Sequence, residues 1–151
     1  VRLAMRVGDT GRVLAQDIMP EAIERLADRV ARERLDNVSL KLGAEDDPRL
    51  PEDSFDRVFM VHMYHEIAEP YAFLWRLRES LREGGEVIVV DANRPVSQHG
   101  MPVRQLLCEF EALGYKLKSF TDKQQAGGYM VRFVVDGPRP EPSALKVCKS
   151  A

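Results

Sequence analysis

Apolar residues change repeatedly between strand-like and helix-like spacing along most of this chain, which limits the folds open to it. Two of the strand-like segments contain continuous apolar runs, Val58 to Val61 and Val87 to Val90. Such runs are typical of strands that helices cover on both faces. The helix-like segments place apolar residues three and four positions apart. Predicted strands cover 12–18, 38–42, 55–63, 86–91, 115–120 and 129–135, and predicted helices cover 1–5, 20–35, 70–83 and 103–113.

This order of elements predicts an α/β fold. Strands that alternate with helices favour a doubly wound, Rossmann-like and mostly parallel sheet, with three layers in the order α/β/α. The 151 residues suffice for one domain with a sizeable core. We expect that domain to cover residues 1–136 and the proline-bearing remainder, 137–151, to form a loose tail.

Composition argues against several classes of partner and site. The chain has 22 basic and 24 acidic residues and a net charge of −2, so no charge excess indicates a nucleic-acid or membrane-surface partner. No apolar run approaches the ~20 residues of a membrane-spanning helix. Cys108 and Cys148 lie far apart, and Cys108 falls in a helical apolar stripe. We therefore expect a buried free thiol and a reducing, cytoplasmic location.

Sheets of this kind bind ligands beyond the carboxyl ends of their strands, which directs attention to four points. These are Asp17, 43–46, 62–66 and 91–94. A carboxylate at Asp17 can accept both ribose hydroxyls of a nucleoside, or it can simply stabilise the next helix N-terminus. An acid after Gly43 can accept an adenine amino group, or it can belong to an acidic surface loop. The residue types alone leave both choices open.

The segment His62-Met63-Tyr64-His65-Glu66 suggests a further role. Two histidines three residues apart beside an acid permit a metal site. Their order differs from His-Glu-x-x-His, however, and His99 has no partner nearby in sequence, so we expect no metal. A substrate-facing histidine that acts as a base or a hydrogen-bond donor is favoured over a structural one, because this loop leaves the sheet on the ligand side.

These positions together resemble the core of class I S-adenosylmethionine-dependent methyltransferases of the small-molecule type. Residues 11–18 are similar to the family's second strand, whose terminal acid binds the cofactor ribose. Residues 43–58, with their Leu-Pro, Ser-Phe-Asp and Val elements, are similar to its third-strand loop and fourth strand. Residues 64–67 match the segment after that strand in small-molecule members, and 81–85 match the helix end before the fifth strand. Residues 128–133 fit the antiparallel last strand of the fold. The family's first strand and glycine-rich loop are expected just upstream of Val1.

The resemblance implies transfer of a methyl group from S-adenosylmethionine to a small-molecule acceptor. Since the sulfonium is a strong electrophile, positioning supplies much of the acceleration, and His65 is the candidate general base. The implied cofactor contacts are the ribose hydroxyls with Asp17, the adenine with Ile18, Ala44 and either Glu45 or Asp46, and the methionine part with backbone groups of Val61 and His62.

Two alternatives remain open. The chain could be a non-catalytic Rossmann-like module for binding or dimerisation, and a homodimer is compatible with the enzyme as well. It could also be a nicotinamide-dependent oxidoreductase with the same ribose acid. The Ser-Phe-Asp and Tyr-His-Glu segments argue against the oxidoreductase, and the sequence contains no Tyr-x-x-x-Lys pair of the short-chain reductases.

Overall fold

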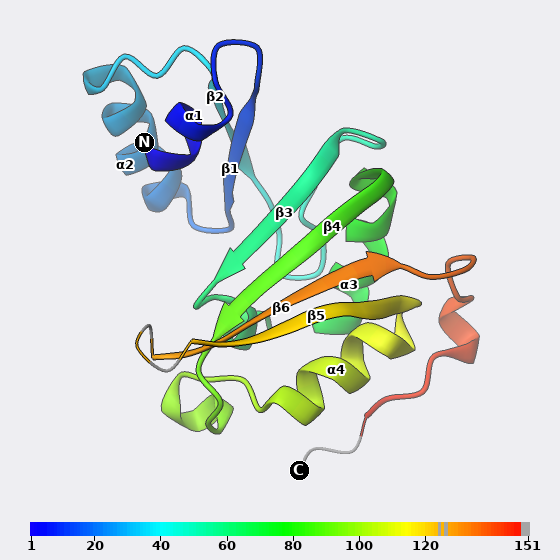
Figure 1. The fold of residues 1–151 in the computed structure, drawn as a ribbon. Helices are drawn as coiled ribbons and strands as arrows, with labels where there is room; N and C mark the ends of the chain where they lie inside the picture. Colours follow the sequence, from blue (N-terminus) through cyan, green and yellow to red (C-terminus); the bar gives the residue numbers. More distant parts are fainter. Residues whose placement is uncertain (124, 126, 149–151) are drawn as a thin grey trace. The chain divides into compact units, whose positions relative to one another are not determined.

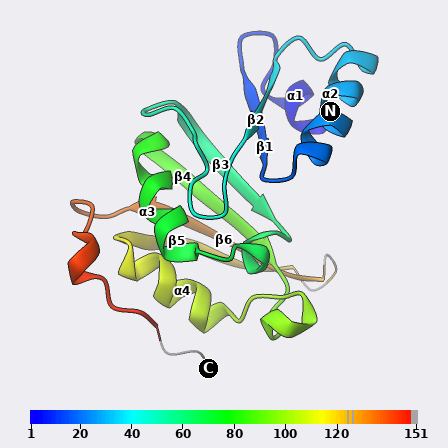
Figure 2. The same cartoon turned by 180° about the vertical axis from the view of Figure 1, so that it is seen from behind.

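The computed structural model describes residues 1–123, 125 and 127–148 (Figures 1 and 2). The chain divides into two compact units, Val1–Leu50 and Pro51–Ala151. Both units contain strands and helices, so the predicted α/β class is confirmed. Within the described residues, no helix is long and apolar enough to cross a membrane.

The first unit pairs two parallel strands and places a helix against them. Its elements are α1 (Arg2–Arg6), β1 (Val13–Asp17), α2 (Pro20–Arg32) and β2 (Val38–Leu42). β1 and β2 run in register from the pair Val13 and Val38 to the pair Asp17 and Leu42, so both carboxyl ends meet at one edge. Pro20 opens α2 at a position where its missing N–H costs no hydrogen bond. The predicted parallel pair and its connecting helix are therefore confirmed.

The second unit contains a mixed sheet of four strands in the order β3-β4-β6-β5 (Figure 1). β3 and β4 are parallel, whereas β6 runs antiparallel to both β4 and β5. The antiparallel last strand that the resemblance implied is confirmed. The elements are β3 (Phe55–Val61), η1 (Tyr64–Glu66), α3 (Pro70–Ser80), β4 (Leu81–Asp91), η2 (Val96–Gln98), α4 (Val103–Ala112), β5 (Tyr115–Lys123), β6 (Gly128–Val135) and η4 (Pro142–Ala144).

The core of the second unit lies between its sheet and the helices α3 and α4, which cover one face of that sheet (Figure 2). Leu74 and Leu77 from α3 and Phe110 from α4 are fully buried. The Phe110 ring stacks on Phe133 of β6, with 3.9 Å between ring centroids. Val87 pairs with Phe133 across the ladder and is also fully buried, so the apolar run of β4 fills the centre of this unit.

Two expectations about this unit are wrong. α3 ends at Ser80, and Gly84 and Gly85 lie within β4 instead of ending the helix. The reason is that Leu81 adopts an extended conformation and pairs with Phe55 of β3, so strand pairing takes precedence over the glycine signal. β3 is an edge strand of its sheet, and its Phe59 and Val61 are exposed instead of covered on both faces.

The cysteine prediction is also wrong, because Cys108 and Cys148 form a disulfide. No free cysteine remains in the part of the chain that the structure describes. The two cysteines are 40 residues apart, and no local sequence pattern indicates that the C-terminal tail is joined to α4. Trp75 Nε1 donates to the Pro140 carbonyl at 2.9 Å, and Arg139 pairs with Glu79 at 2.5 Å. Residues 137–148 are therefore not loose, whereas the single domain 1–136 stays a prediction.

Candidate functional site

In the first unit, the predicted ribose acid and the Gly43 loop are neighbours. Asp17 ends β1, and its carbonyl accepts a hydrogen bond from Gly43 N at 2.9 Å. One carboxylate oxygen, Oδ1, accepts from Met19 N at 3.0 Å, which holds the half-buried side chain at the strand end. Among the described residues the other oxygen, Oδ2, accepts no hydrogen bond. The carboxylate is therefore held in position through Oδ1, and its remaining lone pairs can accept from a pair of hydroxyls.

The loop after β2 is compact and offers acids of different exposure. Ala44 N donates to the Asp47 carbonyl at 2.7 Å, so the loop closes on itself directly after the buried Gly43. The buried side-chain amide of Gln16 packs against Gly43 so closely that a Cβ there would displace it. Glu45 is exposed and Asp46 is half-buried. Either acid is near enough in sequence to Gly43 to serve the predicted adenine contact.

In the second unit, the chain turns sharply at the end of β3. His62 has a positive φ of 50°, a left-handed conformation that is uncommon for a residue other than glycine. Its backbone N donates to the Val90 carbonyl at 2.8 Å, and its half-exposed ring places Nδ1 3.9 Å from Asp91 Oδ1. Backbone strain of this kind gathers at functional sites, and here it directs the following segment back over the strand ends.

His65 lies on η1 and is held by a buried carboxylate. Its side chain is 5% exposed, and Nδ1 lies 3.0 Å and 2.9 Å from the two oxygens of Asp91, which is fully buried. Ala92 N also donates to Asp91 Oδ1, at 2.8 Å. Because an ionised carboxylate only accepts hydrogen bonds, Nδ1 carries the proton and Nε2 points away from Asp91. The sequence singled out both residues but not their pairing.

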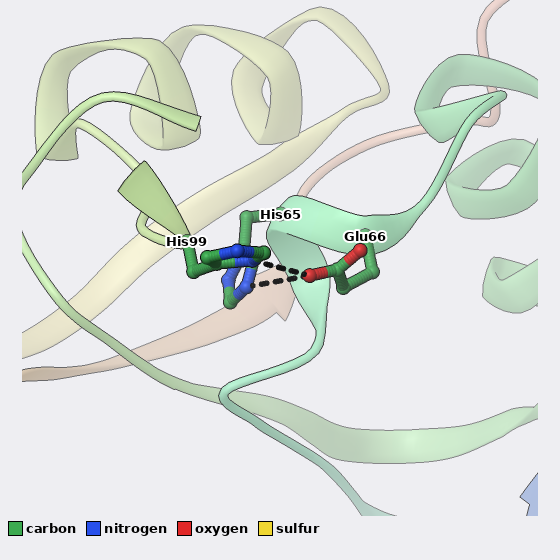
Figure 3. A group of neighbouring side chains, drawn as sticks. All are labelled: His65, Glu66 and His99. Carbon is green, nitrogen blue, oxygen red and sulfur yellow. Dashed lines mark hydrogen bonds and ion pairs between the residues drawn. The ribbon is translucent and has the colours of Figure 1, made fainter. Parts of the chain in front are cut away.

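The Nε2 side of His65 faces two further polar groups (Figure 3). Glu66 Oε1 lies 3.2 Å from His65 Nε2 and 3.1 Å from His99 Nδ1. The hydrogen bond from His99 outweighs desolvation and lowers the pKa of the Glu66 carboxyl. His99 was the histidine to which the sequence gave no partner, so the structure adds it to this site. The three side chains have the donor types that a metal ion binds.

A buried hydrogen bond joins η1 to α4. The Tyr64 hydroxyl donates to Glu109 Oε2 of α4 at 2.7 Å, and both residues are buried. Burial, and then the Glu109 charge, raise the pKa of Tyr64 well above its ordinary value. Sequence reasoning missed Glu109, which reads as an ordinary polar helix position. Its hydrogen bond to Tyr64 holds η1, which also carries His65, against α4.

Arg94 is exposed and binds the backbone of the loop that carries His99. Its guanidinium donates to the His99 carbonyl through Nη2 at 3.1 Å and through Nε at 3.3 Å. Gly100 lies so close to Arg94 and to the Ala92 carbonyl that a Cβ there would overlap them. Arg94 therefore shapes the loop that presents His99.

Comparison with known proteins identifies a family that this chain matches and solved structures that share its fold. Residues 1–89 match a family described as a methyltransferase domain. No curated protein matches the chain significantly. A S-adenosylmethionine-dependent methyltransferase from Aquifex aeolicus is similar in structure, with a TM-score of 0.77 and 22% identity over 87% of this chain and 72% of that one.

Two further solved structures show how widely the fold is shared. A TehB-like S-adenosylmethionine-dependent methyltransferase from Corynebacterium glutamicum has a TM-score of 0.67 and 16% identity, over 88% of this chain and 73% of that one. The [4+2]-cyclase SpnF has a TM-score of 0.70 and 18% identity, over 83% of this chain and 49% of that one. At these identities the structural likeness establishes the fold alone.

Proposed function

This chain belongs to the methyltransferase domain family and uses S-adenosylmethionine as its methyl donor, and we propose that its acceptor is a small molecule deprotonated by His65. Family membership favours the enzyme over the binding module and the oxidoreductase. The donor supplies an electrophilic methyl group, so the protein has to orient the acceptor and remove its proton. The observation that carries the proposal is the buried Asp91–His65 pair at the end of β4.

The first unit supplies the proposed adenosine contacts. Asp17 has one carboxylate oxygen held by Met19 N, which leaves the other to accept from ribose hydroxyls. Ile18 follows with an exposed side chain that can cover one face of an adenine ring. Ala44 is proposed to lie beside the ring, and Glu45 or Asp46 to accept from its amino group.

The second unit supplies the proposed contacts to the methionine part. Val61 is the last residue of β3 and His62 follows it, and the His62 backbone N already donates to the Val90 carbonyl. The remaining backbone groups of these two residues lie at the carboxyl end of a parallel strand pair, where ligands of α/β folds bind.

His65 is proposed as the general base because its ring is held in one orientation. Asp91 fixes a proton on Nδ1, so Nε2 can present a lone pair to an acceptor once Glu66 Oε1, which lies 3.2 Å from it, has moved away. Glu66 occupies that side now, but its side chain is 62% exposed. Because the Glu66 carboxylate is exposed, water screens its ion pairs, and an acceptor can displace it at low cost.

Calorimetry with S-adenosylmethionine tests the cofactor contacts in the full-length protein. Replacement of Asp17 by Ala removes charge-assisted hydrogen bonds of ~1.5–3 kcal/mol, so the dissociation constant should rise about 10- to 100-fold. Asp28→Ala, which removes an exposed acid from α2, is the matched control and should bind like the wild type. Unchanged affinity in Asp17→Ala would contradict the ribose assignment.

Release of S-adenosylhomocysteine tests the acceptor and the base. We expect turnover with one class in a panel of small hydroxyl, amine and thiol compounds, and none with tRNA or DNA. His65→Gln should lower kcat by about 10²- to 10⁴-fold while its affinity for S-adenosylmethionine stays unchanged. A kcat within twofold of the wild type would show that His65 removes no proton in the rate-limiting step.

Location and assembly remain proposals. The cytoplasmic location was inferred from free thiols, and the Cys108–Cys148 disulfide removes that support. A homodimer is likewise proposed.

A further inference from the structure

We propose that His65, Glu66 and His99 bind a zinc ion, and that the bound ion blocks methyl transfer by occupying Nε2 of His65. The binding site stands on geometry alone, and only the blocking effect rests on the proposed function. The three residues come from η1 and from the loop after η2, and Figure 3 shows their side chains converging on one point.

The distances between the donor atoms suit a tetrahedral ion. Zinc binds imidazole nitrogen at about 2.0–2.1 Å and carboxylate oxygen at about 2.0–2.2 Å, which places neighbouring ligand atoms roughly 3.4 Å apart. Glu66 Oε1 lies 3.2 Å from His65 Nε2 and 3.1 Å from His99 Nδ1. All three ligand atoms lie within 4.8 Å of one another. Both distances from Glu66 therefore already suit the ion, and the two histidine nitrogens lie within reach of the same point.

The surroundings of His65 are those of a metal ligand. Asp91 accepts from Nδ1 at 2.9 Å, and a carboxylate behind an imidazole in this way fixes its tautomer and makes the other nitrogen a better ligand. Asp91 is buried, and Glu66 adds a second negative charge beside two imidazoles. This combination of nitrogen and carboxylate ligands favours zinc over magnesium or calcium, which prefer oxygen donors.

His99 is presented by a strained and tightly held loop. Its φ of 54° is left-handed, and the Arg94 guanidinium donates twice to its carbonyl. The ring itself is 80% exposed. The backbone is therefore fixed while the ligand atom stays accessible, which leaves a fourth coordination position open to water. Zinc sites with three protein ligands and one open position have this form.

The ion and the acceptor compete for one lone pair. His65 Nε2 can either accept the acceptor's proton or bind zinc, but it cannot do both. Removing zinc should therefore restore methyl transfer. Loss of His99 should therefore remove inhibition by zinc, measured as the ratio of turnover with and without zinc in the same variant.

Calorimetry and cobalt absorption test the site directly, on untagged full-length protein that has been stripped with a chelator. We expect one zinc per chain, and Co²⁺ should give the visible absorption of a four-coordinate ion. His99→Ala should weaken zinc binding by at least about 10-fold, comparable to or larger than the loss of a second-shell partner. His62→Ala is the matched control, because the chain has three histidines and His62 is not a ligand. Its affinity should stay within about threefold of the wild type.

Three results would overturn the proposal or its parts. Absence of 1:1 binding, or equal weakening by His99→Ala and His62→Ala, would refute the metal site. Binding that leaves S-adenosylhomocysteine release unchanged would refute the blocking effect and the role of His65 as base, while the metal site would stand. Inhibition of the wild type that disappears in His99→Ala supports both parts.

Discussion

A buried carboxylate on the helix-free side of the sheet offers a sharp test of the second unit. The Glu86 side chain is 2% exposed, yet three cations surround it. Its Oε2 accepts from Arg132 Nε at 2.7 Å, Oε1 contacts Lys118 Nζ, and Arg57 lies at 3.8 Å. These residues come from β4, β6, β5 and β3, so one side chain joins all four strands.

Replacement of Glu86 by Gln keeps the shape and removes the charge. Breaking a buried ion pair from one side costs about 3–5 kcal/mol. The cationic partners are 37–47% exposed, so water compensates part of that loss, and we expect a decrease of about 2–3 kcal/mol in the free energy of unfolding at pH 7. Glu83→Gln, which alters an exposed acid of the same strand, is the control and should change it by less than about 0.5 kcal/mol.

The effect should depend on pH in one direction. Burial opposes ionisation of Glu86, but hydrogen bonds from Lys118 and Arg132 prevail and lower the pKa of its carboxyl from the ordinary 4.5. A lowered pKa contributes stability that is present above the unfolded value and is lost as the pH falls through the folded one. The difference between wild type and Glu86→Gln should therefore shrink as the pH falls below about 4.

Urea unfolding followed by circular dichroism at pH 7, 5, 4 and 3 measures this difference. An equal loss of stability at pH 7 and pH 3 would contradict the assignment of that loss to the ionised carboxylate of Glu86. A larger loss at pH 3 would reverse the expected sign and refute the reasoning outright.

Two further predictions concern groups buried in the same unit. Burial raises the pKa values of Tyr64, Tyr115 and Tyr129, so stability is full below the unfolded value near 10 and falls as the pH rises above it. Absorbance at alkaline pH should show these three tyrosines ionising together with unfolding, and ionisation of all three in the folded protein would contradict their burial. Reduction of Cys108–Cys148 frees a loop of 40 residues and should cost about 3–4 kcal/mol in urea unfolding, whereas an unchanged midpoint in dithiothreitol would contradict that constraint.

Sequence periodicity predicted most elements because their cores repeat locally. The strand Val38–Leu42 begins and ends where expected, and α2 begins at Pro20. The end of α3 was missed because it depends on Leu81 pairing with Phe55, 26 residues upstream in the chain. The disulfide was missed for the same reason, since it joins a helix to a distant tail. Errors therefore fall where a non-local contact competes with a local signal.

The candidate residues of the first unit and those of the second differ in how far the sequence could predict their contacts. Asp17 and Gly43 follow two parallel strands, and the rule that carboxyl ends meet at one edge was enough to bring them together. His65 and Asp91 follow β3 and β4 in the same way, and the same rule could have paired them. The sequence singled out His65 and Asp91 individually, but the contact between their side chains was not predicted.

His99 needs a different explanation, because 33 residues separate it from Glu66. The Ala92 carbonyl accepts from both Arg94 N and Met101 N, so the chain leaves the end of β4 and returns to the same point. Met101 is buried there, and its own carbonyl accepts from the Tyr129 hydroxyl at 2.8 Å. Backbone hydrogen bonds to the Ala92 carbonyl thus close the loop. Every residue has such backbone groups, so they give no sequence pattern from which the loop could be predicted. A histidine on such a loop gains its partner only after the sheet has formed, so its contribution to ligand binding depends on the integrity of β4 and β6.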